Sequence, residues 1–146
     1  MGIEKTVYKQ YEVAKSRNWD RMYWAVDLHG TLILPNYEKM KAADVVYYPD
    51  AMDVMRMLTA RPDIRLIMYT CSWPSEVEEY QKRFTADGIR FDWVNENPEV
   101  AQTEYGDYSK KPYFNVLMDD KSGFEPDREW RYLKLFLKML PQLRPT

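Results

Sequence analysis

Four polar side chains of this sequence come directly after short apolar runs of the kind that form buried strands. They are Asp27, Thr70, Asp119 and Asp120. Gly30–Thr31 follows closely on the first of them, and this pair breaks the strand and predicts a tight loop. Carboxylates held close together repel one another unless a cation or protons relieve the repulsion. The three acids therefore indicate a cation site, on condition that the fold brings them together.

The strands that must bring these residues together are four apolar runs separated by helical patterns. The runs cover Met22–Val26, Ile64–Tyr69, Ile89–Val94 and Tyr113–Met118. Strands alternating with helices predict an α/β fold, a three-layer Rossmann-like parallel sheet with helices on both faces and right-handed crossovers. The carboxyl ends of parallel strands share one edge, where open α/β folds bind their ligands. We therefore expect Asp27, Thr70 and Asp119 at a single site.

Four helices are predicted from the spacing of apolar residues. An N-terminal helical extension over residues 1–20 has Ile3, Val7, Tyr11 and Ala14 at helical spacing. Later helices are expected with Asp50 and Ser72 as N-caps, and the last helix begins at Pro126. Pro74 suits the first turn of its helix, and Gly88 is a natural stop.

Irregular segments separate these elements. Pro35–Asn36 predicts a turn, and Val45–Tyr48 is a short β-like run. The polar stretch Asn95–Pro112 is longer than a usual connection, so it is either a functional loop or partly disordered.

The overall composition favours one ordinary globular domain over residues 1–146. Hydrophobic residues make up 45% of the chain and charged residues 30%. The net charge of −2 gives no electrostatic footprint for non-specific nucleic-acid binding. No apolar run reaches membrane-spanning length, and the single cysteine suits a reducing cytoplasm, the expected location. Aromatic residues, at 15%, could serve the core or stack on a flat ligand.

The acids form an oxygen-only ligand set, which suits Mg²⁺ better than zinc. A magnesium site of this kind usually leaves positions for phosphate oxygens. Thr70 could donate a hydrogen bond to such a phosphate, and Lys110 or Lys111 could neutralise it. Asp27 placed in line with phosphorus could attack and form an aspartyl-phosphate. Trp73 could stack on a ring or pack at its helix start, and Cys71 is expected to be a small buried neighbour.

Four segments, in this order, resemble the motifs of the haloacid dehalogenase-like (HAD) superfamily. They are Asp27–Thr31, Leu66–Thr70, Lys111–Pro112 and Val116–Asp120. The resemblance runs from about Met22 to Lys121 and leaves the N-terminal helix unexplained. It implies a Rossmann-like fold and a Mg²⁺-dependent phosphohydrolase, and because both usual insertion points are short, it implies a member without a cap domain. An open site of this kind goes with large substrates or with closure by another subunit of a homo-oligomer.

The resemblance also implies a role for each site residue. Asp27 would be the nucleophile and also a metal ligand. The carbonyl of His29 and the carboxylate of Asp119 would be further ligands, and Asp120 would bind the metal or hold a metal-bound water. Thr70 would bind the phosphate together with Lys111 or the neighbouring Lys110. The family's phosphatases normally have a second Asp where this chain has His29. An imidazole can both donate and accept a proton near neutral pH, so His29 could take over the acid/base work.

These observations leave two functions open. The first is a Mg²⁺-dependent phosphomonoester hydrolase, acting on a phosphorylated small molecule, a nucleotide or a nucleic-acid end. The second is a catalytically weak or inactive binding module that keeps the fold and the metal. A phospho-acceptor receiver domain also uses acids, a Thr and a Lys, but there the acidic pair comes at the first strand, whereas here it comes last.

Overall fold

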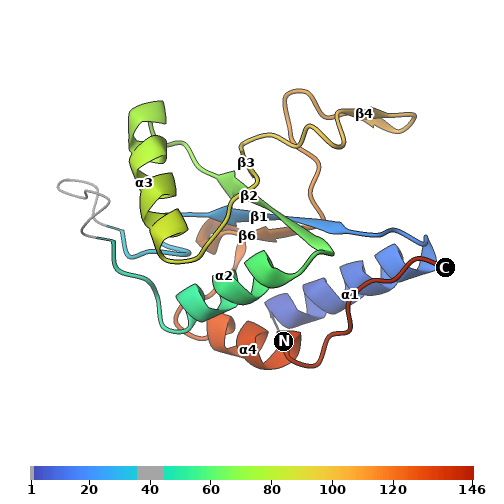
Figure 1. The fold of residues 1–146 in the computed structure, drawn as a ribbon, viewed down its shortest axis with the longest axis horizontal. Helices are drawn as coiled ribbons and strands as arrows, with labels where there is room; N and C mark the ends of the chain where they lie inside the picture. The colour runs from blue at the N-terminus through green and yellow to red at the C-terminus, as the bar shows by residue number, and fades with distance from the viewer. Residues whose placement is uncertain (1, 36–44) are drawn as a thin grey trace.

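The computed structural model describes residues 2–35 and 45–146 and has a four-stranded parallel sheet at its centre (Figure 1). The strands lie in the order β3-β2-β1-β6. They are β1 (Met22–Asp27), β2 (Ile64–Tyr69), β3 (Trp93–Val94) and β6 (Val116–Met118). β1 pairs with β2 over its whole length and with β6 on its other side, all in parallel. The prediction of a parallel α/β sheet is therefore confirmed.

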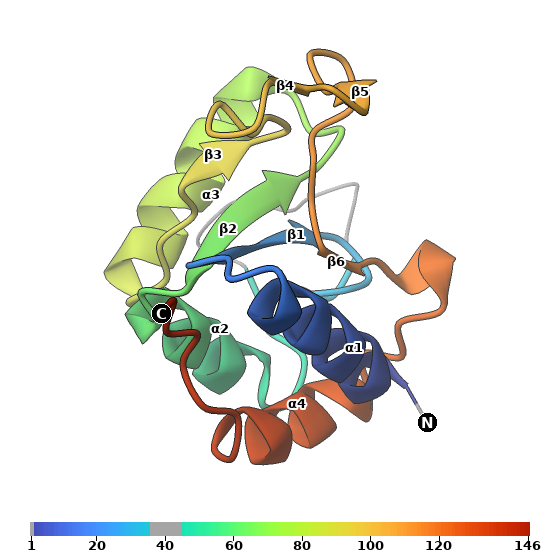
Figure 2. The ribbon, with the colours of Figure 1, turned by 90° about the vertical axis from the view of Figure 1, so that its right-hand side faces the viewer.

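Three helices lie together on one side of this sheet (Figure 2). They are α1 (Ile3–Ser16), α2 (Ala51–Ala60) and α4 (Glu129–Leu137), while α3 (Pro74–Ala86) runs beside β3. The buried apolar residues of all four helices join one core cluster with the strand residues Met22, Trp24 and Leu66. Side chains alternate between the faces of a strand, so these residues mark one face of the sheet.

The opposite face has a small cluster built on Tyr23, Ala25 and Ile67, and none of its residues comes from the described helices. Residues of the crossover between β3 and β6 cover it, among them Val100 and Tyr113. In the described residues this crossover forms only a short hairpin, β4 (Gln102–Thr103) with β5 (Gly106–Asp107). The prediction of helices on both faces is therefore wrong. The polar crossover, interrupted by Pro98, Gly106 and Pro112, has no apolar face at helical spacing and contributes single side chains instead.

Several local predictions are confirmed. The buried residues of α1 are Ile3, Val7, Tyr11 and Ala14, those that the spacing predicts. α1 packs on α4 and β6, so the N-terminal extension is part of the core. Pro74 is the first residue of α3, and Gly88 follows its end with a φ of 83°. The predicted turn at Pro35–Asn36 extends outside the described residues.

Other local details differ from the prediction. The third and fourth strands are shorter than their apolar runs, and Tyr47 makes a single bridge to Ile33. Asp50 stands at the N-cap of α2 without a capping bond, because its carboxylate pairs with Lys134. The last helix begins at Glu129, after a turn that contains Pro126. No helix in the described part of the chain has the length and apolar character that a membrane crossing needs.

Candidate active site

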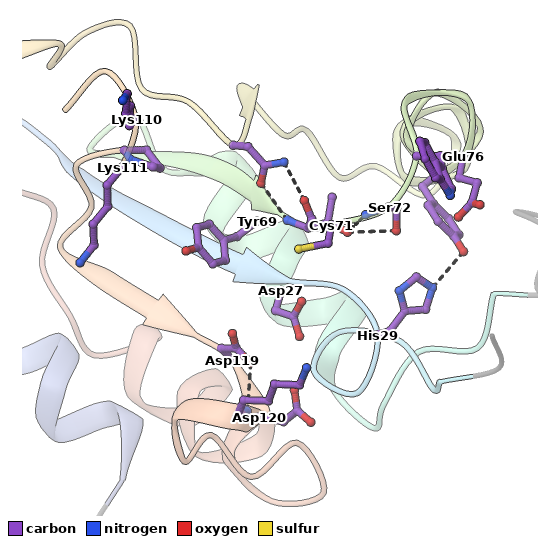
Figure 3. Close-up of a pocket in the computed structure, with 16 residues that line it drawn as sticks. Asp27, His29, Tyr69, Cys71, Ser72, Glu76, Lys110, Lys111, Asp119 and Asp120 are labelled. Atoms are coloured by element: carbon purple, nitrogen blue, oxygen red, sulfur yellow. Dashed lines mark hydrogen bonds between the residues drawn. The ribbon is translucent and has the colours of Figure 1, made fainter.

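The three predicted acids meet at the carboxyl edge of the sheet (Figure 3). Asp27 is the last residue of β1, Asp119 follows β6, and Asp120 begins the 3₁₀ turn η2 (Asp120–Ser122). One carboxylate oxygen from each lies within 4.8 Å of the others. Adjacent parallel strands end side by side, so the topology alone brings together residues that are more than ninety positions apart.

Thr31 joins two of these acids and is completely buried. Its hydroxyl lies 3.1 Å from an oxygen of Asp27 and 3.1 Å from an oxygen of Asp120, and it accepts the backbone N–H of Asp120 at 2.9 Å. The one hydroxyl proton serves one carboxylate at a time. The Thr31 carbonyl accepts the indole N–H of Trp130 at 2.8 Å, which ties the loop to the core. Thr31 therefore positions the acids.

Gly30 lets this loop pass close to Asp120. Its φ is 83°, a left-handed conformation that glycine adopts without strain. A Cβ at this position would lie 2.9 Å from a carboxylate oxygen of Asp120. A larger residue would therefore both strain the loop and displace the acid.

The acid cluster is electrostatically unbalanced. Burial and the charge of Asp119 raise the pKa of Asp27 to about 6, against hydrogen bonds from Thr31 and the backbone of Leu28 that lower it. Asp120 raises this pKa further. None of the ion pairs in residues 2–35 and 45–146 includes the three acids. An all-oxygen set that lacks charge compensation fits a hard divalent cation such as Mg²⁺.

Thr70 is held beside this cluster by Asn95, which follows β3. The backbone N–H of Thr70 donates to the Asn95 side chain at 2.9 Å, and the Asn95 amide donates back to the Thr70 carbonyl at 2.7 Å. The Thr70 hydroxyl accepts the N–H of Ser72 at 3.1 Å and lies 3.0 Å from the Ser72 hydroxyl. Ser72 therefore supports Thr70, whereas the sequence predicts Ser72 as a helix cap.

His29 points from the first loop toward α3 (Figure 3). Its ring Nε2 lies 3.0 Å from the hydroxyl of Tyr80, and the two rings meet edge to face. Burial lowers the pKa of His29, and the charge of Glu76 partly offsets this. Burial and the same glutamate raise the pKa of Tyr80. Both groups are therefore neutral near pH 7, and the phenol keeps its proton.

These residues line one open cavity of about 740 Å³. Lys110 and Lys111 are exposed on the opposite side from His29 and Glu76, at the end of the crossover (Figure 3). Lys121, which the sequence prediction leaves out, also lines the cavity. Which lysine faces a phosphate stays a prediction.

The structure thus brings the acids, His29 and Thr70 to one cavity, with the two predicted lysines at its rim. Sequence reasoning missed three supporting residues, Thr31, Asn95 and Tyr80. Thr31 lies in the quoted Gly-Thr pair, and Asn95 follows a predicted strand as the acids do, so both had a signal. Tyr80 had none, because helical spacing places it only on an inner face. Cys71 is exposed, so the prediction of a buried cysteine is wrong.

Comparison with known proteins adds a fold relationship. No protein-family model and no curated protein matches the chain. Among solved structures, the chain is similar to that of a conserved protein encoded by a locus of Bacteroides thetaiotaomicron, with a TM-score of 0.61 and 24% sequence identity. The match covers 82% of this chain and 91% of the other. A likeness at this identity shows the shared fold alone.

Proposed function

We propose that this chain is a Mg²⁺-dependent phosphomonoester hydrolase of the HAD-like type that works through an aspartyl-phosphate on Asp27. The observation that carries the proposal is the cluster of Asp27, Asp119 and Asp120 oxygens within 4.8 Å, in the same cavity as Thr70. Asp27 and Asp119 are half-buried and Asp120 is exposed, and the cluster has no cationic partner among the described residues. The four motifs of the sequence support the same reaction class.

The proposed reaction balances with the chain's own groups, one water and a bound Mg²⁺. A carboxylate oxygen of Asp27 attacks phosphorus, an acyl-phosphate bond forms, and the bond from phosphorus to the ester oxygen breaks. A water then attacks the phosphorus of the aspartyl-phosphate and gives a proton to His29, which has lost its own to the leaving oxygen. This step restores the Asp27 carboxylate and releases inorganic phosphate. Thr70 would donate to a phosphoryl oxygen, and Lys110 or Lys111 would add positive charge. Mg²⁺, held by the three acids and the carbonyl of His29, would neutralise the negative charge of phosphate and acids.

The His29 side chain is the proposed proton donor to the leaving oxygen. The donor would be the imidazolium form, a minor fraction near pH 7 because burial lowers the pKa of His29. In that form Nε2–H donates to the Tyr80 oxygen, and Nδ1–H is the proton given to the leaving oxygen. In Figure 3 the ring nitrogen that does not bond Tyr80 is the one turned toward Asp27. General acid help of this kind is worth roughly 10²–10⁴-fold in rate.

Hydrolysis of an aryl phosphate in the presence of Mg²⁺ tests this proposal. Wild-type protein should turn over, chelation should stop turnover, and Asp27→Asn should lower it more than about 10³-fold, because the amide is not a nucleophile. Asp127→Asn makes the same chemical change on the exposed turn before α4 and should leave turnover unchanged. Equal turnover by Asp27→Asn and wild type would refute the proposal.

A binding module without turnover is the second candidate, and His29 favours it. With Nε2 engaged by Tyr80, the side chain differs from the acid that the family's phosphatases have at this position. Calorimetry would then show Mg²⁺ and inorganic phosphate binding to wild type and not to Asp119→Asn, while no phosphomonoester is hydrolysed. That result would replace the enzyme with the module.

A further inference from the structure

We propose that Trp73 is the ring-binding surface of the substrate site, and that the substrate is a nucleoside monophosphate, a single phosphate ester bearing a flat base. This inference rests on the proposed function, because it assigns the group beyond the phosphate that Asp27 would attack. The supporting features are the exposure of the indole, the rigidity of its backbone, and the charge around it.

The indole of Trp73 is 73% exposed and lines the same cavity as Asp27 and Thr70. By contrast, Trp24 and Trp130 are completely buried in the core. A single exposed apolar side chain is common on protein surfaces, but the walls of ligand pockets are lined predominantly by hydrophobic and aromatic side chains. The sequence predicts either stacking on a ring or packing at the helix start, and an exposed indole in the wall of this cavity favours stacking.

The start of α3 does not need this side chain. The backbone carbonyl of Trp73 accepts the N–H groups of Glu76 and Val77, at 2.9 and 3.0 Å, and a residue of any type could supply it. No side-chain capping bond is made at this helix start. The helix is anchored elsewhere, through the buried Tyr80 and Phe84.

The backbone on both sides of Trp73 is nevertheless held at the cavity. On one side, Thr70 and Ser72 are tied to each other, and Thr70 is tied to Asn95. On the other side, Pro74 fixes the first turn of α3. An aromatic ring on such a fixed segment offers a preorganised stacking face, because binding orders little of the chain.

The negative charge of Glu76 favours a ligand with a single phosphate group. Glu76 lines the cavity one helical turn after Trp73, and its negative charge reaches His29 and Tyr80. A phosphate chain or a phosphodiester running past the indole would meet this carboxylate and be repelled. The lysines that could attract further phosphate lie on the opposite side of the cavity (Figure 3). A nucleoside monophosphate satisfies both conditions.

Tryptophan fluorescence tests the inference without depending on turnover. The probes are the phosphonate analogues of adenosine monophosphate and of ribose 5-phosphate, in which CH₂ replaces the ester oxygen, each titrated with Mg²⁺. The adenosine probe should quench fluorescence and bind about ten-fold more tightly than the ribose probe, the expected gain from one stacked base. Quenching should be lost in Trp73→Phe although affinity, measured by calorimetry, is kept.

Trp73→Ala is the decisive variant. It should weaken the adenosine probe about ten-fold and leave the ribose probe within two-fold. Tyr105→Ala, which removes an aromatic side chain that is 88% exposed and lines a different cavity, should change neither. Equal affinity of the two probes, unchanged by Trp73→Ala, would overturn the ring site and leave the proposed function standing.

Two further results would overturn the inference. Tighter binding of a 5′-phosphorylated oligonucleotide than of the adenosine probe would replace the monophosphate by a polynucleotide end. Absence of Mg²⁺-dependent binding of either probe, together with no aryl phosphate hydrolysis, would remove the ring site and the proposed function alike.

Discussion

The acids at the two edges of the sheet differ in whether a cationic side chain pairs with them. At the amino edge, Asp63 precedes β2 and is 1% exposed. Its carboxylate pairs with Arg61 at 2.8 Å and accepts the backbone N–H of Leu143 at 2.9 Å. At the carboxyl edge, Asp27 faces two other acids and receives only hydrogen bonds from neutral groups among the described residues.

Asp92, at the amino end of β3, follows the same rule as Asp63. One of its oxygens accepts the N–H of Leu66 at 2.8 Å, and the other accepts from Arg90 at 3.0 Å. Each of these two acids therefore has both an arginine and a backbone donor. The carboxyl-edge cluster receives backbone N–H groups from Leu28 and Lys121 but no cationic side chain among the described residues. It is a better candidate for function, because perturbed acids gather at functional sites. The contrast between the edges is the strongest argument for a cation site.

The first way to break this contrast is to remove the compensated acid. Asp63→Asn should lower the free energy of unfolding by about 2–3 kcal/mol, since it breaks a buried pair and loosens the tail at Leu143. Turnover per folded molecule should stay unchanged. Urea unfolding measures the first quantity, and Asp127→Asn serves as the exposed control. A loss below about 1 kcal/mol would mean that the amino edge owes little to its pairing.

The second way is to remove the neutral group that holds the acids in place. Thr31→Val keeps the buried volume and loses the hydroxyl that contacts Asp27 and Asp120. Mg²⁺ affinity and kcat should fall by about 10–100-fold, the usual cost of losing a group that orients metal ligands. Thr31→Ser restores the hydroxyl and should restore most of both. Equal effects of Val and Ser would show that the methyl group, and hence packing, matters more than the hydrogen bonds.

The contrast also explains how far the sequence predicts this molecule. Strand ends are visible as apolar runs that stop, and in a parallel sheet they share one edge, so the meeting of Asp27 with Asp119 was predictable without coordinates. The second face was not. A crossover without a helix has no periodic pattern of apolar residues from which packing could be predicted. Tyr113 and Leu117 pack on the second face only because the tertiary fold places them there. Local rules therefore succeeded for the helical side of the sheet and failed for the other.

At the site, the sequence predicts the candidate metal ligands but not the residues that position the site's side chains. Acids at strand ends are conspicuous, but the bond from Tyr80 to His29 joins residues fifty-one positions apart through a helix whose orientation no local pattern gives. Asp50 and Ser72 show the reverse failure. Both residues stand where helix caps are expected. The Asp50 carboxylate instead forms an ion pair with a lysine of α4, and the Ser72 hydroxyl forms a hydrogen bond with Thr70. Tertiary partners decided these side chains.

The third prediction sharpens the contrast through pH. The pKa of Asp27 is about 6 in the fold, above its ordinary value of 3.8, so the folded state binds a proton at higher pH than the unfolded chain does. Burial and repulsion of the charged carboxylate therefore destabilise the fold in full above pH 6, and this stability returns as the pH falls toward 3.8. The lowered pKa of His29 acts in the opposite direction below 6.5, so the Asp27 effect must be isolated by difference.

That difference is the Tm of wild type minus the Tm of Asp27→Asn, measured with a chelator present. Between about pH 7.5 and about pH 5 it should rise by roughly 2–4 °C, because only wild type regains the stability that charging Asp27 removes. Mg²⁺ should raise the wild-type Tm more at the higher pH, since protons compete with the metal for the carboxylates. Parallel Tm curves for the two proteins would mean that the pKa of Asp27 is the same in the folded and the unfolded state. The carboxyl edge would then be as well compensated as the amino edge, and the case for a cation there would rest on the motifs alone.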